Sequence, residues 1–178
     1  LNFTTDLKLT VDKSDVLFIA VGTPPQEDGS ADLVHVLNVA KGIGEAMESY
    51  KIIVTKSTVP VGTSEKVKNT IKEQLEKRGI DITFDIASNP EFLKEGNAIT
   101  DFMKPDRIVI GTENEHTADI LKQIYKPFTH NFNNIISMDI LSSELTKYAA
   151  NSMLATKISL MSEISNIADA VGADIECV

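Results

Sequence analysis

The sequence predicts an α/β fold in which a parallel sheet with flanking helices is followed by one long helix. Short apolar runs rich in β-branched residues, such as 15–21 and 51–57, lack polar alternation, which is typical of strands buried on both faces. Helical patterns separate these runs. Strict alternation of strand and helix indicates βα units, a parallel sheet and right-handed crossovers.

The individual elements follow from the hydrophobic pattern in chain order. Strands are expected at 15–21, 51–57, 81–88, 106–112 and 134–138, with the end of another at 1–5. Helices are expected at 31–48, 64–78 and 116–128, and the last two carry an apolar stripe at helical spacing. Gly79 is the predicted stop of the second helix, and Asn114 the predicted start of the third.

The last predicted helix is the longest. From 142 to 171 neither Pro nor Gly interrupts the pattern, and about 30 residues at 1.5 Å each span about 45 Å. Such a helix links two domains, supplies a subunit interface, or is a long core helix. If the helix links two domains, residues 1–141 belong to one domain and 142–178 begin another.

Charge and composition narrow the function. The chain has 17 Lys and Arg against 26 Asp and Glu, so its net charge of −9 argues against binding nucleic acid or an anionic membrane. A small ligand is expected. No run approaches the roughly 18 apolar residues of a membrane span, so a cytoplasmic location is the default expectation. The single cysteine, Cys177, and three dispersed histidines predict neither a disulfide nor a metal site.

Ligands of open parallel sheets bind beyond the carboxyl ends of the strands, so the segments after each strand are the candidate sites. After the first strand, Gly22 permits close backbone approach and Thr23 offers a hydroxyl. After the second, Ser57 and Thr58 present hydroxyls. Thr63 and Ser64 are expected to cap the next helix. Thr58 lies too far ahead for capping, which favours a role in a site.

Two further segments carry paired polar residues. Asn89-Pro90 predicts a turn, and Glu91 and Glu95 share a face if 91–95 forms a helical turn. On spacing alone this pair is a solvated acidic face, but its place after a strand favours function. Lys147 and Asn151, four residues apart on the long helix, could both hold an oxygen that gains negative charge, or could equally be a solvated helix face.

A phosphate-binding glycine loop is absent from the sequence. Residues 42–47 contain Gly-x-Gly but lack the third glycine, and they fall inside a helical pattern rather than between strand and helix. If the protein binds a dinucleotide, the turn that holds the pyrophosphate is not in this stretch.

Five motifs in series nevertheless resemble one family. They are "VGTPPQEDGSADL", "KSTVPVGT", "SNPEFLKEGNAI", "PDRIVIG" and "SSELTKYAANSMLATKISLMSEISNIADAVGAD". Together they are similar to the UDP-glucose 6-dehydrogenase family, within the nucleotide-sugar dehydrogenases, over essentially the whole chain. The resemblance implies a Rossmann-like NAD-binding domain and then the long central helix that begins the middle domain.

The resemblance also implies a reaction. The family oxidises the C6 hydroxyl of UDP-glucose to a carboxylate with two NAD⁺, through a thiohemiacetal and a thioester on a cysteine. Family members carry a Gly-x-Gly-x-x-Gly loop before this region and the cysteine and UDP-binding domain after it. The chain is thus expected to be the middle of the enzyme and to be inactive alone. Cys177 lacks the family's Gly-Gly-Ser context and is read as incidental.

Site roles follow from matching positions. Lys147 and Asn151 resemble the residues at the C6 oxygen, and Thr58 and Glu91 the pair that positions and activates the hydrolytic water. Glu95 resembles a residue near the nicotinamide. The sugar site is expected along Glu91, Phe92, Leu93, Lys94 and Glu95, with Lys147 and Asn151. Contacts to NAD are expected from Val21, Gly22, Thr23, Pro24, Ser57 and Thr58, and no metal is expected.

The same motifs favour UDP-glucose as the substrate, because GDP-mannose dehydrogenases tend to carry Arg-Glu-Ser in place of the Lys-Glu-Gly at 94–96. Three alternatives stay open: a GDP-mannose dehydrogenase, a UDP-N-acetylmannosamine dehydrogenase, and a non-catalytic module that dimerises or binds a partner. The family commonly pairs through its long helix, so a homodimer of the full-length protein is expected.

Overall fold

The computed structural model describes residues 1–94, 96–129 and 134–178. The elements in chain order are α1 (Leu7–Asp12), β1 (Val16–Ile19), α2 (Val34–Ala46), β2 (Ile52–Thr55), α3 (Thr63–Arg78), β3 (Asp85–Ser88), α4 (Ala98–Met103), β4 (Ile108–Gly111), α5 (Glu115–Tyr125), η1 (Lys126–Phe128), β5 (Ile135–Met138), α6 (Ile140–Val171) and η3 (Ile175–Cys177).

The strands form one sheet in the order β1-β2-β3-β4-β5. β1, β2 and β3 pair in parallel, and so do β4 and β5. The predicted Rossmann-like α/β class is thus confirmed. In the part of the chain described, none of the helices is long and apolar enough to cross a membrane.

One pairing departs from the predicted all-parallel sheet. β3 and β4 are antiparallel and meet only through Ser88 and Gly111, the last residue of each strand. The short α4 and its flanking loops join β3 to β4, and they return the chain without a crossover. The sheet thus has two parallel halves, β1–β3 and β4–β5, which point their carboxyl ends toward each other. As a result, the carboxyl ends of β3, β4 and β5 all lie at one place.

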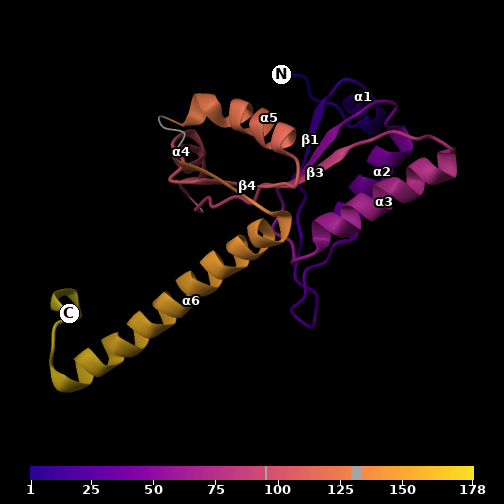
Figure 1. Cartoon of the computed structure of the whole chain (residues 1–178). Helices are drawn as coiled ribbons and strands as arrows, with labels where there is room; N and C mark the ends of the chain where they lie inside the picture. Colours follow the sequence, from indigo (N-terminus) through magenta and orange to yellow (C-terminus); the bar gives the residue numbers. More distant parts are fainter. Residues whose placement is uncertain (95, 130–133) are drawn as a thin grey trace.

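Helices cover both faces of the sheet (Figure 1). On one face, buried residues of β1 to β3 pack against α1, α2 and α3, for example Ile53 and Ile86 against Val67 and Ile71. On the other face, residues of the opposite parity, such as Ile52, pack with β4 and α5. This alternation explains why the strands read as continuous apolar runs.

α6 runs away from the sheet and its helices (Figure 1). It begins two residues earlier than predicted, at Ile140, because the Asp139 carboxylate accepts a hydrogen bond from the Ser142 amide at 2.8 Å. Its first two turns contact β3 and β4. Most side chains beyond Ala150 are exposed, including those of many large apolar residues.

Two predicted helix ends were correct, while one predicted strand was wrong and two short helices were missed. Gly79 ends α3 with φ of 65°, and the Asn114 side chain caps α5, as predicted. Residues 1–5 are not a strand. The helices α1 and α4 were not predicted, because at 6 residues each they are too short to show periodicity.

Candidate active site

The loops after β1 and β2 lie against each other through two side-chain hydrogen bonds. The Thr23 hydroxyl donates to the Thr58 carbonyl at 2.8 Å, and the Ser57 hydroxyl donates to the Val21 carbonyl at 2.6 Å. Both hydroxyls are therefore used to join the loops. Gly22 and Pro24 are exposed, and a Cβ added to Gly22 would meet no atom within 4 Å, so the backbone there faces open space.

Glu91 lies in an irregular segment after β3. Residues 91–94 are not helical, so the expected helical turn from 91 to 95 does not form in its described part. Instead the Glu91 carboxylate bends back and accepts a hydrogen bond from the Leu93 amide at 2.6 Å. Glu95 lies outside the described residues, so the expectation that both carboxylates share a face stays a prediction.

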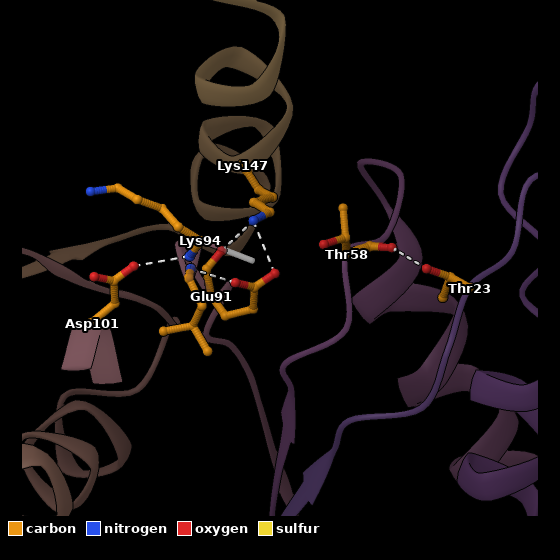
Figure 2. A network of polar contacts seen from close by, with 7 residues as sticks. Thr23, Thr58, Glu91, Lys94, Asp101 and Lys147 are labelled. Carbon is orange, nitrogen blue, oxygen red and sulfur yellow. Dashed lines mark hydrogen bonds and ion pairs between the residues drawn. The ribbon is translucent and has the colours of Figure 1, made fainter. Parts of the chain in front are cut away.

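Lys147 reaches Glu91 from the second turn of α6 (Figure 2). Its Nζ donates to the Glu91 backbone carbonyl at 2.5 Å and lies 3.0 Å from Oε1 of the same residue. Lys147 is buried and the Glu91 side chain is 31% exposed, so the ion pair is only partly screened by water. An ammonium has three donors, and two point at Glu91, which leaves one for a ligand oxygen.

Thr58 lies between Thr23 and the Glu91–Lys147 pair in the view of Figure 2. Its carbonyl is bonded to Thr23, but its hydroxyl makes no hydrogen bond within the described residues. The hydroxyl is thus available to a ligand or a water. Asn151 is exposed one turn beyond Lys147, and its side chain too makes no hydrogen bond within the described residues.

The remaining residues predicted for the sugar site surround this pair. Two cations lie near the Phe92 ring, the Arg107 guanidinium 4.4 Å and the Lys147 Nζ 5.4 Å from its centroid. The Lys94 side chain is exposed, while its amide donates to the Asp101 carboxylate at 3.0 Å (Figure 2). The amide of Leu93 is already bonded to Glu91.

A buried polar cluster behind Glu91 was missed by the sequence analysis. The Lys56 Nζ donates to Oδ1 of Asn89 at 3.2 Å and to the Tyr125 hydroxyl at 3.4 Å. The Tyr125 hydroxyl donates to the same Asn89 oxygen, and Nδ2 of Asn89 donates to the Val109 carbonyl at 2.8 Å. With Glu91, these side chains line a cavity of about 40 Å³. The cluster fixes the turn that carries Glu91.

The pKa shifts in this cluster have one main cause, burial. Burial lowers the pKa of the Lys56 ammonium, the Glu91 carboxylate acts in the opposite direction, and Lys147 lowers it further. Burial also raises the pKa of the Tyr125 phenol to about 12. The hydrophobic pattern did not identify Lys56 or Tyr125 as site residues, because their partners are distant in the sequence and come close only in the folded chain.

A second residue missed from sequence is Glu144. The prediction that Thr63 and Ser64 cap α3 was wrong, because the Thr63 hydroxyl donates backward to Pro60 and neither side chain caps the helix. The Glu144 carboxylate of α6 accepts instead from the amides of Gly62 and Ser64. A lone Glu in a helical pattern gives no sequence signal for such a contact.

Together these groups could take a proton from a ligand or a water and stabilise the oxygen left with negative charge. The site offers a carboxylate that can accept a proton, an ammonium that can stabilise negative charge, and a hydroxyl that can hold a water. Among the described residues no cluster of His, Cys, Asp or Glu could hold a metal ion. The arrangement lies at the carboxyl ends of β2 and β3, where open α/β sheets bind ligands.

Comparison with known proteins gives a consistent match. Residues 1–129 match the NAD binding domain of the UDP-glucose/GDP-mannose dehydrogenase family, and residues 141–178 match its central domain. The chain is 47% identical over 176 residues to a UDP-glucose 6-dehydrogenase of Pseudomonas aeruginosa, covering 99% of this chain and 39% of that protein. It therefore spans about two fifths of this relative's length.

Solved structures agree. A UDP-glucose dehydrogenase from Pyrobaculum islandicum superposes with a TM-score of 0.89 at 42% identity, covering 97% of this chain and 39% of that one. A GDP-mannose dehydrogenase from Pseudomonas aeruginosa superposes with a TM-score of 0.86 at 37% identity, covering 97% of this chain and 40% of the other. Enzymes for both sugars therefore share this architecture.

Proposed function

Because the chain belongs to the UDP-glucose/GDP-mannose dehydrogenase family, we propose that it is part of an NAD-dependent enzyme that oxidises UDP-glucose at C6 to UDP-glucuronate. Residues 1–141 contribute the later part of the NAD-binding domain. Residues 142–178 contain most of the long helix α6 and begin the middle domain. The observation that carries the proposal is the contact of Lys147 with Glu91 after β3, with Thr58 following the neighbouring strand β2.

The loops after β1 and β2 fit a bound dinucleotide. Open space above Gly22 lets a flat ligand approach the backbone of Val21 to Pro24. The hydroxyls of Thr23 and Ser57 hold the two loops together, so their contribution is to shape the surface. NAD bound there supplies the hydride acceptor. Glu95 is proposed to face the nicotinamide.

Lys147 and Asn151 are proposed to hold the C6 oxygen of the sugar. Two of the three Lys147 donors hold Glu91. The third is directed to the sugar oxygen, where it stabilises the negative charge that develops as the hydroxyl proton leaves. Asn151 supplies an amide one turn further on. The backbone of Glu91 to Lys94, with two cations near the Phe92 ring, lines the sugar.

Glu91 and Thr58 are proposed to act in the hydrolytic step. The Glu91 carboxylate is ion-paired and accepts a further hydrogen bond from Leu93, so it has a fixed orientation toward an approaching water. The Thr58 hydroxyl can accept or donate a hydrogen bond to that water. General-base assistance of this kind contributes about 10²- to 10⁴-fold to a rate.

A homodimer through α6 is proposed for the full-length protein. Exposed apolar side chains recur along one side of the helix beyond the sheet, including Met153, Leu160, Met161, Ile167 and Val171. An apolar stripe of this length is unusual on a monomer surface and is typical of an interface.

The test uses the full-length protein that carries these residues. With UDP-glucose and NAD⁺ it is expected to form two NADH for each UDP-glucuronate, and to prefer UDP-glucose to GDP-mannose and UDP-N-acetylmannosamine in kcat/KM. The chain of 178 residues alone is expected to form no NADH. The second candidate is GDP-mannose oxidation, which the structural match to a GDP-mannose dehydrogenase favours. A preference for GDP-mannose would select it.

A further inference from the structure

Glu144 is a buried carboxylate that the proposed reaction does not use. It lies on the second turn of α6 and is 2% exposed. Its Oε2 accepts from the Gly62 amide at 2.6 Å, and its Oε1 accepts from the Ser64 amide at 2.7 Å. Both bonds are short and charge-assisted, which places them among the stronger hydrogen bonds of a protein.

These two bonds cap α3 from another element of the fold. The N-cap residue of α3 is Gly62, with φ of 89°, and it has no side chain to cap the helix. The first amides of a helix need acceptors, and a negative charge there is favoured by the helix dipole. The Glu144 carboxylate meets both requirements from a residue about 80 positions later in the chain.

The same two turns of α6 contact the candidate site on two further sides. Ser143 donates from Oγ to the Ser88 side chain at 3.0 Å, at the point where β3 and β4 meet. The close approach of Ser143 to Gly111 leaves no room for a Cβ at that glycine. Lys147, three residues after Glu144, holds Glu91. Glu144 also joins this helix to the loop after β2.

That loop carries Thr58. It is held at its start by the amides of Lys56 and Ser57, which donate to the Ile19 carbonyl at 2.8 and 3.2 Å. Thr58 itself is held through its carbonyl by Thr23. At the far end the loop reaches Gly62 and the Glu144 carboxylate. Glu144 is thus one of the contacts that hold the loop carrying Thr58.

We propose that Glu144 is a positioning residue, which sets the Thr58 loop in place against the Lys147–Glu91 pair. This inference rests on the proposed function for its effect on the rate, but the contact itself can be tested without activity. A merely structural role would lower stability alone. A positioning role lowers kcat in an enzyme that remains folded and still binds its substrates.

The experiment replaces Glu144 by Gln in the full-length protein. An amide of the same shape keeps one acceptor oxygen and turns an NH₂ group toward the other backbone amide, so at least one of the two bonds is lost. Hydrogen–deuterium exchange read by mass spectrometry is expected to rise at least tenfold at Gly62 to Lys66 and at Lys56 and Ser57, whose amides hold the start of the Thr58 loop. kcat is expected to fall at least tenfold, with KM for UDP-glucose and for NAD⁺ changed less than twofold.

Leu75→Ala is the matched control. Leu75 is buried near the other end of α3, so the change destabilises the same helix without touching the Thr58 loop. Its kcat is expected to equal that of the parent below the unfolding temperature. If Glu144→Gln does not fold, Glu144→Asp keeps the charge on a shorter side chain and is expected to show the same changes in smaller degree.

Three results overturn the inference. They are unchanged exchange at Gly62 and Ser64, faster exchange there without any change at Lys56 and Ser57, and a parental kcat despite faster exchange. If the parent enzyme forms no NADH with any nucleotide sugar, the proposed function fails, and the exchange data still decide whether Glu144 holds the Thr58 loop.

Discussion

The Lys147 ammonium contacts Glu91 twice, through the backbone carbonyl at 2.5 Å and through Oε1 at 3.0 Å. A helix that leaves the sheet and an irregular loop after β3 are thereby joined at a single buried cation. The Lys147 ammonium is also proposed to hold the sugar oxygen. Its position therefore fixes both the Glu91 base and that oxygen. Changes at either residue are therefore expected to affect both steps of the oxidation.

Glu91→Gln in the full-length protein is expected to lower kcat for UDP-glucose by about 10²- to 10⁴-fold, because an amide cannot accept a proton from water. If the full-length protein carries the nucleophilic cysteine that the family resemblance implies, the variant should stall after that cysteine captures the substrate, so that a covalent adduct accumulates. Intact-mass spectrometry of the reacted protein detects the adduct. Glu73→Gln, an exposed carboxylate paired with Lys77 on α3, is the control and should turn over normally. Unimpaired turnover by Glu91→Gln would remove Glu91 from the mechanism.

Lys147→Met is expected to reduce kcat by about 10²- to 10³-fold, because it removes the charge that stabilises the developing oxyanion. It also leaves Glu91 without its ion-pair partner. Steady-state NADH formation measures the loss, with Lys77→Met as the control for an exposed lysine. A variant that keeps half or more of the parental kcat would contradict the assignment.

Tyr125→Phe is expected to change how stability depends on pH. The folded-state pKa of Tyr125 is about 12, above the usual 10, so its contribution is complete below pH 10 and falls as pH rises toward 12. At pH 8 the variant should be less stable by about 1 kcal/mol, because the phenol's hydrogen bond to Asn89 is lost.

By pH 11 the parent should itself have lost about 1 kcal/mol, so the two free energies of unfolding should converge. Urea unfolding at pH 8 and pH 11 measures both. The lowered pKa of Lys56 makes the free energy of unfolding rise with pH, opposite to the effect of Tyr125. This rise is expected in both the parent and the variant, so the difference between them removes most of it. A constant difference at the two pH values would show that Tyr125 does not titrate in this way.

Leu160→Lys is expected to weaken association of the full-length protein, since Leu160 is 57% exposed on the apolar side of α6. A buried lysine in an apolar interface loses hydration without gaining a partner. Sedimentation velocity at micromolar concentration should show a shift from dimer to monomer. Asn166 lies on the opposite side of the helix, so Asn166→Lys should leave the dimer intact. If both variants dissociate alike, the apolar side of α6 is not the interface.

Much of the fold followed from local pattern. The apolar runs predicted β1 to β5, and Gly79 and Asn114 marked helix ends correctly, because strand burial and helix capping depend on residues close in the chain. The strand proposed for residues 1–5 was wrong, and the reversed direction of β4 was not foreseen. Strand direction depends on how the connection returns, which a hydrophobic pattern does not encode.

The sequence by itself determined which residue types follow each strand, and so it singled out Thr58, Glu91 and Lys147. The tertiary structure decided how they are held. Lys56 and Tyr125 meet at Asn89, and Glu144 reaches the start of α3, across separations of 33 to 82 residues. Such contacts arise only when the two halves of the sheet meet at Ser88 and Gly111 and bring the start of α6 to the loops of the parallel strands. Their physical basis is the need of each buried polar group for a partner, and the folded chain supplies that partner from a distant segment.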